Sequence, residues 1–95
     1  MVRGKTQSGI KYTVNENVKK DARFSYFLTK AMNENIAETE RGSAVFSMIA
    51  ILFGGEDKMI VFMDEVAKKN NGVCDEEVLM REVSEILESI GAKKS

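Results

Sequence analysis

Cys74 is the single cysteine of this 95-residue sequence, and its thiol is the side chain best suited to act as a nucleophile. It precedes Asp75, where a helix is predicted to begin, and a helix N-terminus lowers the pKa of a thiol. A cysteine-histidine pair is excluded, however, because the sequence contains no histidine. A small, partly buried apolar side chain is therefore the simpler interpretation of Cys74.

The segment around Gly72 has the outline of a calcium-binding loop between two helices, but its residue types do not fit. With Gly72 at the sixth position of such a loop, Ala67, Lys69 and Val78 take the first, third and twelfth positions. Calcium needs oxygen ligands at these positions, and none of the three can supply a carboxylate. The sequence therefore predicts no metal site here.

Two further patterns also lack catalytic chemistry. Glu76 and Glu77 point in different directions on a helix, and the helix dipole is enough to explain acidic residues in a first turn. Gly54 and Gly55 are followed by acidic residues, which repel a phosphate rather than bind it. We therefore expect a protein that is not an enzyme and that has no catalytic residue, cofactor or metal.

The charges are balanced and dispersed, since 14 Lys and Arg against 15 Asp and Glu give a formal net charge of -1. This offers no basic field to nucleic acid, and the cations Arg3, Lys5 and Lys11 fit a frayed polar tail. Two helices joined at Gly54 and Gly55 would suit a helix-turn-helix, but the second presents Met, Ile, Val and Phe where Arg, Asn or Gln read bases. Nucleic-acid binding is not predicted, and a small helical DNA-binding regulator is the alternative.

Cysteine usage and hydropathy indicate the compartment. One cysteine cannot form an internal disulfide, which fits a reducing cytoplasm. The longest unbroken apolar run, residues 48–53, is far shorter than the roughly 20 residues of a membrane-spanning helix. The N-terminus lacks the charged-then-apolar layout of a signal peptide. We expect a cytoplasmic protein that does not bind membranes.

The first third of the chain is predicted to contain a tail, a short strand and a helix. Residues 1–9 are polar and indicate an N-terminal tail, whereas Ile10, Tyr12 and Val14 alternate with polar residues as in a strand. Asn15 or Asn17 can cap the helix that follows. The apolar face of that helix consists of Phe24, Phe27, Leu28 and Ala31, with Val18 and Met32 near its edges.

A second helix is predicted in the middle of the chain. Residues 33–42 are polar and form the connection to it, and Ser43 is its expected N-cap. The helix ends at Phe53, because Gly54 and Gly55 suit a left-handed turn at a helix C-terminus.

Two more helices follow from their ends and their apolar spacing. The third begins at Glu56 and ends near Lys69, before an Asn-Asn-Gly turn, and the fourth is capped by Asp75 and ends at Gly91. Their apolar stripes are Met59, Phe62, Met63 and Val66, then Leu79, Val83, Ile86 and Ile90. The predicted fold is all-α: residues 10–95 form a single domain, a compact bundle of about four helices with a short N-terminal extended segment.

The second and third helices carry more apolar side chains than one helix contact requires. One face follows the i, i+3, i+4, i+7 spacing from Val45, yet Phe46 and Phe53 make the opposite side apolar too. An exposed apolar patch usually marks an interaction surface, and methionine adapts to irregular partners. The predicted partner-binding residues are Val45, Phe46, Met48, Ile49, Leu52, Phe53, Met59, Phe62 and Met63. Self-association into a structural homo-oligomer would cover this surface as well as another protein would.

The order of these segments resembles the tail assembly chaperones of long-tailed bacteriophages with non-contractile tails, and of their prophages. The resemblance spans residues 10–95. It rests on residues 10–16 (IKYTVNE), 21–24 (DARF), 51–57 (ILFGGED) and 85–95 (EILESIGAKKS), together with the helix order. None of these segments is a catalytic signature.

The resemblance implies a non-enzymatic helper in the cytoplasm of a bacterial host. Such proteins bind the aggregation-prone tape-measure protein, keep it soluble, bring tail-tube protein to it and are absent from the finished tail. Many relatives also have a longer product made by ribosomal frameshifting, and Lys93 and Lys94 fit a slippery adenine run. The resemblance implies that this chain is the short form, with the tape-measure protein as its main partner.

Overall fold

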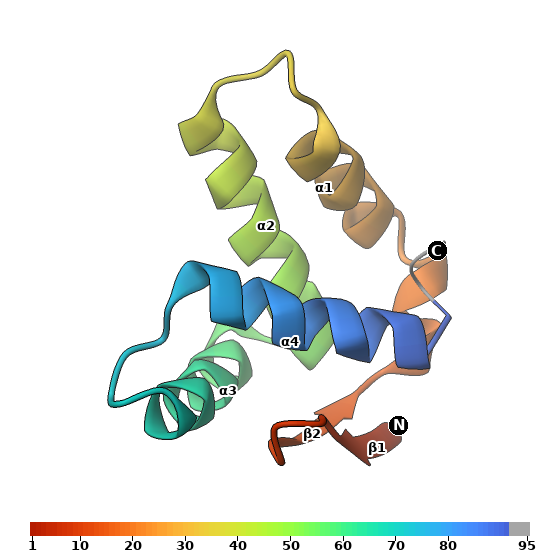
Figure 1. Ribbon diagram of the computed structural model, residues 1–95. Coiled ribbons are helices and arrows are strands. Elements are labelled where there is room, and N and C mark those ends of the chain that lie inside the picture. The colour runs from red at the N-terminus through yellow and green to blue at the C-terminus, as the bar shows by residue number, and fades with distance from the viewer. Residues whose placement is uncertain (92–95) are drawn as a thin grey trace.

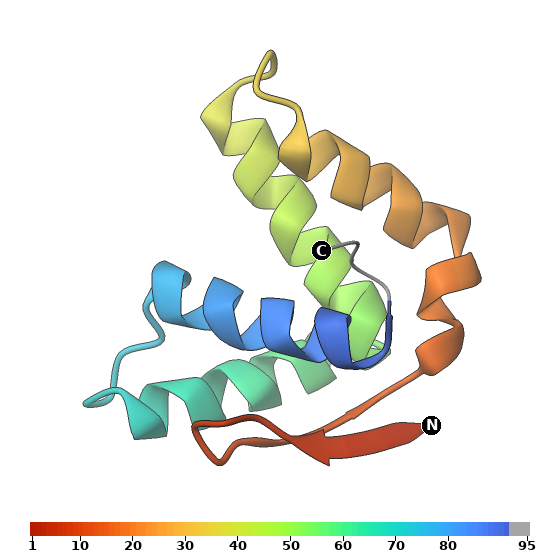
Figure 2. The same cartoon turned by 45° about the vertical axis from the view of Figure 1, so that its right-hand side comes forward.

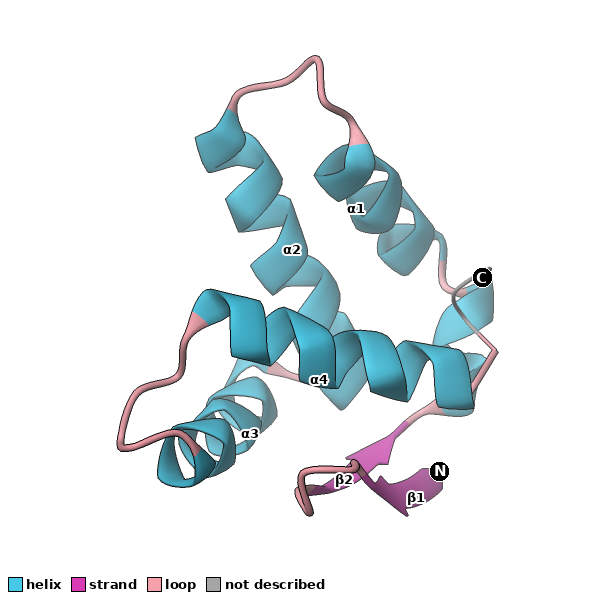
Figure 3. Cartoon of the chain, in the orientation of Figure 1, coloured by secondary structure: helices cyan, strands magenta, loops and turns pink. Residues whose placement is uncertain are grey.

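Four α-helices, a short 3-10 helix and a two-stranded sheet make up residues 1–91, the part of the chain that the computed structural model describes (Figure 1; Figure 3). The elements are β1 Val2–Lys5, β2 Lys11–Val14, η1 Glu16–Lys20, α1 Ala22–Met32, α2 Glu38–Phe53, α3 Glu56–Lys69 and α4 Glu76–Ser89. Helices α1 and α2 form a hairpin that projects at one end, and α3, α4 and the sheet lie at the other (Figure 2). The predicted helical fold is confirmed, although the sheet makes it mostly helical rather than all-α.

The predicted boundaries of α3 and of the start of α4 are confirmed, and local chemistry explains them. Asp75 Oδ1 accepts hydrogen bonds from the backbone N–H groups of Glu77 at 2.8 Å and Val78 at 3.4 Å, which caps α4. Gly54 ends α2 with φ of 88°, a left-handed conformation that glycine adopts without a steric penalty. Helix α3 then begins at Glu56.

The predicted first helix is interrupted. Asn15 caps only η1, where its Oδ1 accepts a 2.9 Å hydrogen bond from the Asn17 N–H, and α1 begins after a second cap, Asp21. The Arg23 side chain donates to Asp21 Oδ2 at 2.7 Å, and the Arg23 backbone N–H donates to Oδ1 at 2.9 Å. These bonds, the side-chain one above all, lower the pKa of Asp21 to about 2.

The predicted start of α2 is wrong. The helix begins at Glu38, so the N-terminal part of the expected connection is a short loop and Ser43 lies inside the helix. Glu38 and Glu40 occupy the first turn, where the helix dipole favours negative charge. These residues are exposed at the projecting end of the hairpin. Because this turn has no buried apolar face, the hydropathy pattern of the sequence does not indicate a helix there.

The expected free tail is also wrong, because residues 2–5 form β1. This strand pairs antiparallel with β2, and Val2 lies opposite Val14, Gly4 opposite Tyr12 and Lys5 opposite Lys11. Val14 is fully buried, while Tyr12 donates or accepts a 3.0 Å hydrogen bond between its hydroxyl and that of Ser89 in α4. One face of the hairpin therefore packs on the helical body.

A buried glutamate fixes the turn of this hairpin to α4. Glu82 is 2% exposed, and its Oε1 accepts a 2.7 Å hydrogen bond from the hydroxyl of Thr6, which is 3% exposed. Ser8 donates to Glu82 Oε2 at 3.2 Å, and the Gln7 N–H donates to Glu85 Oε2 at 2.8 Å. Burial of a carboxylate destabilises the folded state unless the carboxylate is hydrogen-bonded. The hydrogen bonds from Thr6 and Ser8 offset this destabilisation at Glu82.

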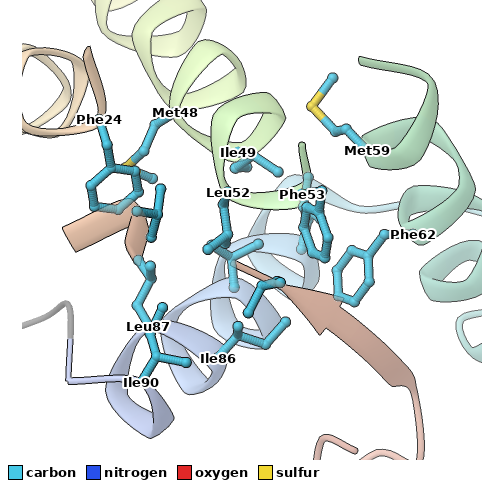
Figure 4. Packing of buried hydrophobic residues seen from close by; sticks show 14 of the residues in the cluster. Phe24, Met48, Ile49, Leu52, Phe53, Met59, Phe62, Ile86, Leu87 and Ile90 are labelled. Carbon is cyan, nitrogen blue, oxygen red and sulfur yellow. The ribbon is translucent and has the colours of Figure 1, made fainter. Parts of the chain in front are cut away.

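One apolar cluster joins the sheet, η1 and all four α-helices (Figure 4). Its fully buried members include Val14 from the sheet, Leu52 from α2 and Val66 from α3. The rings of Phe53 and Phe62 stack with centroids 4.5 Å apart, which fixes the junction between α2 and α3. The cluster lies at the sheet end of the molecule, so the outer part of the α1–α2 hairpin stands away from it.

Alanine in place of Gly4 and alanine in place of Gly42 are expected to change the free energy of unfolding in opposite directions. At Gly4 an added Cβ would collide with the ring of Tyr12, so Gly4→Ala is expected to displace Tyr12, break its bond to Ser89 and cost about 1–2 kcal/mol. At Gly42, inside α2, an added Cβ meets nothing within 4 Å, so Gly42→Ala is expected to stabilise by about 0.5–1 kcal/mol. Urea denaturation of both variants measures the two free energies of unfolding, and equal effects would contradict the position of the Tyr12 ring over Gly4.

Candidate protein-binding surface

Most of the predicted partner-binding residues lie in the core. Six of the nine are at most 7% exposed, and only three are half-buried. The buried six are Met48, Ile49, Leu52, Phe53, Met59 and Phe62, and the half-buried three are Val45, Phe46 and Met63. The buried six therefore pack inside the folded chain, and their role as partner contacts stays a prediction.

Helix α2 is apolar on two sides because different elements cover them. Helix α1 packs along α2, and Phe24 from α1 and Met48 from α2 belong to the same cluster. On the other side α4 crosses the C-terminal half of α2, and α3 folds back from it (Figure 1; Figure 2). Most of the apolar side chains of α2 and α3 are thus covered within one molecule.

A smaller part of α2 remains accessible around Phe46. This side chain borders two shallow pockets, one of about 100 Å³ with Val45 and Met80, and one of about 320 Å³ with Ala50 and Met59. We call Val45, Phe46, Ala50 and Met80 the Phe46 patch. All four are half-buried, so their outer atoms can be covered further by a partner.

Carboxylates border the Phe46 patch at both ends. Glu76, from the first turn of α4, lines the smaller pocket, and Glu56, from the first turn of α3, lines the larger one. Both side chains are exposed. The patch therefore presents an apolar centre with negative charge on its rim, which suits an apolar segment flanked by cations.

Sequence reasoning missed Met80 and Ala50. Met80 lies outside the predicted apolar stripe of α4, and its position beside α2 depends on how the two helices cross. Ala50 is too small to stand out in a hydropathy pattern, although it lines a pocket together with Ser43 and Ser47. Neither contact has a signal in local sequence.

Cys74 is half-buried in the turn before α4. Burial raises the pKa of its thiol, and the negative charges of Asp64 and Asp75 add to this effect. The thiol therefore stays protonated at neutral pH, which agrees with an apolar packing role and not with an activated nucleophile.

Within residues 1–91, no group of three or more Cys, Asp or Glu side chains is arranged to hold a metal ion. In the same residues, no helix combines the length and the apolar character needed to cross a membrane. The exposed side of α3, the recognition helix in the helix-turn-helix alternative, carries three acidic and three basic side chains, which are Glu56, Asp57, Asp64, Lys58, Lys68 and Lys69. Its exposed charges are therefore balanced, and α3 presents no basic face.

Comparison with known proteins does not extend this description. No protein-family model matches the chain, and neither the curated proteins nor the solved structures include a significant match.

Proposed function

We propose that this chain is a non-enzymatic tail assembly chaperone, which binds an apolar helical segment of the tape-measure protein of a long-tailed phage and keeps it soluble. It acts in the cytoplasm of the bacterial host, and tail-tube protein is a further partner. The resemblance in segment order motivates the client, and the Phe46 patch is the observation that supports a protein-binding role. The proposed slippery site at Lys93 and Lys94 lies outside the described residues.

The Phe46 patch fits the side chains of an amphipathic helix better than a folded surface. Its pockets are shallow and lie next to each other along α2, with Phe46 between them. Successive apolar side chains on one face of a client helix, spaced i and i+3 or i+4, can occupy neighbouring pockets of this kind. Lys or Arg on the flanks of the client would pair with Glu56 and Glu76.

The test is co-expression with a tape-measure fragment that is insoluble alone. Phe46→Asp places a charge in the centre of the patch and is expected to reduce soluble fragment at least about tenfold, because an apolar contact is replaced by an unpaired carboxylate. Because Phe46 is half-buried and not in the core, the variant is expected to stay folded, which circular dichroism checks.

Val73→Asp is the matched control, since Val73 is an exposed apolar residue in the α3–α4 turn, 59% accessible and outside the patch. It is expected to leave solubilisation unchanged. If folded Phe46→Asp solubilises the fragment as well as the unmodified chain does, the patch is not the client site. If the unmodified chain does not solubilise it, the proposed function fails.

A further inference from the structure

The backbone of α2 does not require the glycine at position 42. Among the glycines of residues 1–91, Gly42 is the one that has neither a positive φ nor any atom within 4 Å of an added Cβ. It lies inside α2, and glycine in a helix interior destabilises the helix relative to alanine, because its unfolded backbone has more freedom to lose. The open space that the missing side chain leaves on α2 therefore needs another explanation.

This open space borders the smaller pocket of the Phe46 patch. The pocket is lined by residues from the N-terminal halves of two helices, which are Gly42, Val45 and Phe46 of α2 and Glu76, Leu79 and Met80 of α4. Helices α2 and α4 diverge toward their N-terminal ends, and the pocket lies in the angle between them (Figure 2). Leu79 is 1% exposed, so the pocket reaches down to the core.

The pocket has the size and polarity of a socket for one aliphatic side chain. Its volume is about 100 Å³, and Glu76 is the charged residue among those that line it. An apolar cavity of about 150 Å³ accommodates benzene, so this pocket suits a somewhat smaller group, such as the side chain of leucine. A longer side chain at position 42 has room to extend over the pocket, because Gly42 itself lines it.

We propose that this pocket receives one leucine-sized anchor of a client helix, and that glycine at position 42 keeps the pocket open for it. The proposal rests on the chaperone function proposed above and narrows its site to one client residue. Glu76 has no ion pair within residues 1–91, so a Lys or Arg one turn from the anchor can pair with it. Gly42 is thus a specificity-determining residue, which lowers the stability of α2 and selects the anchor by its size.

The first test measures fold stability and client solubilisation in the same variants. Gly42→Leu fills the pocket from within, so it is expected to raise the midpoint of urea unfolding and yet to reduce the yield of soluble tape-measure fragment about tenfold. Gly42→Ala adds only a Cβ, and its expected loss of soluble fragment is about threefold. A residue with a purely structural role would change stability and solubilisation in the same direction.

The second test uses three synthetic amphipathic helical peptides that carry lysine on their flanks and differ only in one central residue, which is Ala, Leu or Trp. In fluorescence anisotropy the unmodified chain is expected to bind the Leu peptide about tenfold more tightly than the other two. Alanine leaves the pocket empty, and tryptophan is too large for it. Gly42→Leu is expected to abolish this preference.

Thr39→Leu is the matched control, since it adds a leucine at an exposed position of α2 outside both pockets, and it is expected to change neither measurement. The proposal is overturned if folded Gly42→Leu solubilises the fragment as well as the unmodified chain does while Phe46→Asp does not. Equal affinity of the unmodified chain for the three peptides would also overturn it. A chain that fails to solubilise the fragment but prefers the Leu peptide would lose the chaperone function and keep the size selection at Gly42.

Discussion

Phe53→Asp is expected to unfold the protein. Phe53 is 5% exposed and stacks on Phe62 at a centroid distance of 4.5 Å, so the change removes a core ring and buries a carboxylate in an apolar cluster. Loss of the ring costs about 3–5 kcal/mol, and transfer of the charge out of water adds several more. Folded domains are stable by only about 5–15 kcal/mol, and a small domain has a small core.

Circular dichroism and the dispersion of amide signals in a proton–nitrogen NMR spectrum measure this outcome. Phe46→Asp is the matched control, because it makes the same chemical change on the same helix at a half-buried position. A folded Phe53→Asp protein with wild-type dispersion would mean that the α2–α3 junction is not packed as described. It would also mean that the Phe53 side chain is accessible to a partner.

The contrast between these two phenylalanines shows what local sequence can and cannot predict. The spacing along α2 correctly indicates a helix that is apolar on more than one side. Which side is covered depends on α1 and on the crossing of α4, whose residues share the apolar cluster with α2 and line a pocket with it although they lie far away in the chain. Phe46 and Phe53 belong to one helix and have the same side chain, so only the tertiary arrangement separates the surface residue from the core residue.

The boundaries that could be predicted are those with a capping mechanism. Asp75 before α4 and Gly54 after α2 are recognisable because one residue type satisfies backbone groups or adopts a positive φ there. The start of α2 has no side-chain cap, since Ala37 occupies that position. Its first turn is polar and exposed, which is also typical of a loop.

The β1 strand could not be predicted for a different reason. It has four residues, one of them glycine, and Val2 is its single apolar side chain. Its order comes from pairing with β2 and from hydrogen bonds between the turn and α4, which lies more than 70 residues away in the sequence. Once β1 is paired with β2, the cations Arg3 and Lys5, which were expected on a frayed tail, occupy fixed positions on a strand.

Glu82→Ala is expected to release the β hairpin from α4. The change leaves the buried Thr6 hydroxyl without the acceptor that now lies 2.7 Å away, and it removes the acceptor of Ser8. Because an orphaned buried donor costs about 1–3 kcal/mol, we expect a loss of about 2 kcal/mol and a fall in Tm of roughly 10 °C. Amide hydrogen exchange is expected to accelerate most in residues 2–14, because they depend on this contact, and less in α2 and α3.

Two matched variants show whether burial of the carboxylate is the cause. Glu85→Ala removes the exposed acceptor of the Gln7 N–H and is expected to cost at most about 0.5 kcal/mol. Glu82→Gln keeps an acceptor for Thr6, and the Ser8 hydroxyl can rotate to accept from the amide, so less than half of the alanine loss is expected. Equal losses for Glu82→Ala and Glu85→Ala, or uniform exchange throughout the chain, would show that the hairpin is held by its apolar face alone. In that case Val14 and Tyr12, and not the glutamate, would hold the hairpin beside α3.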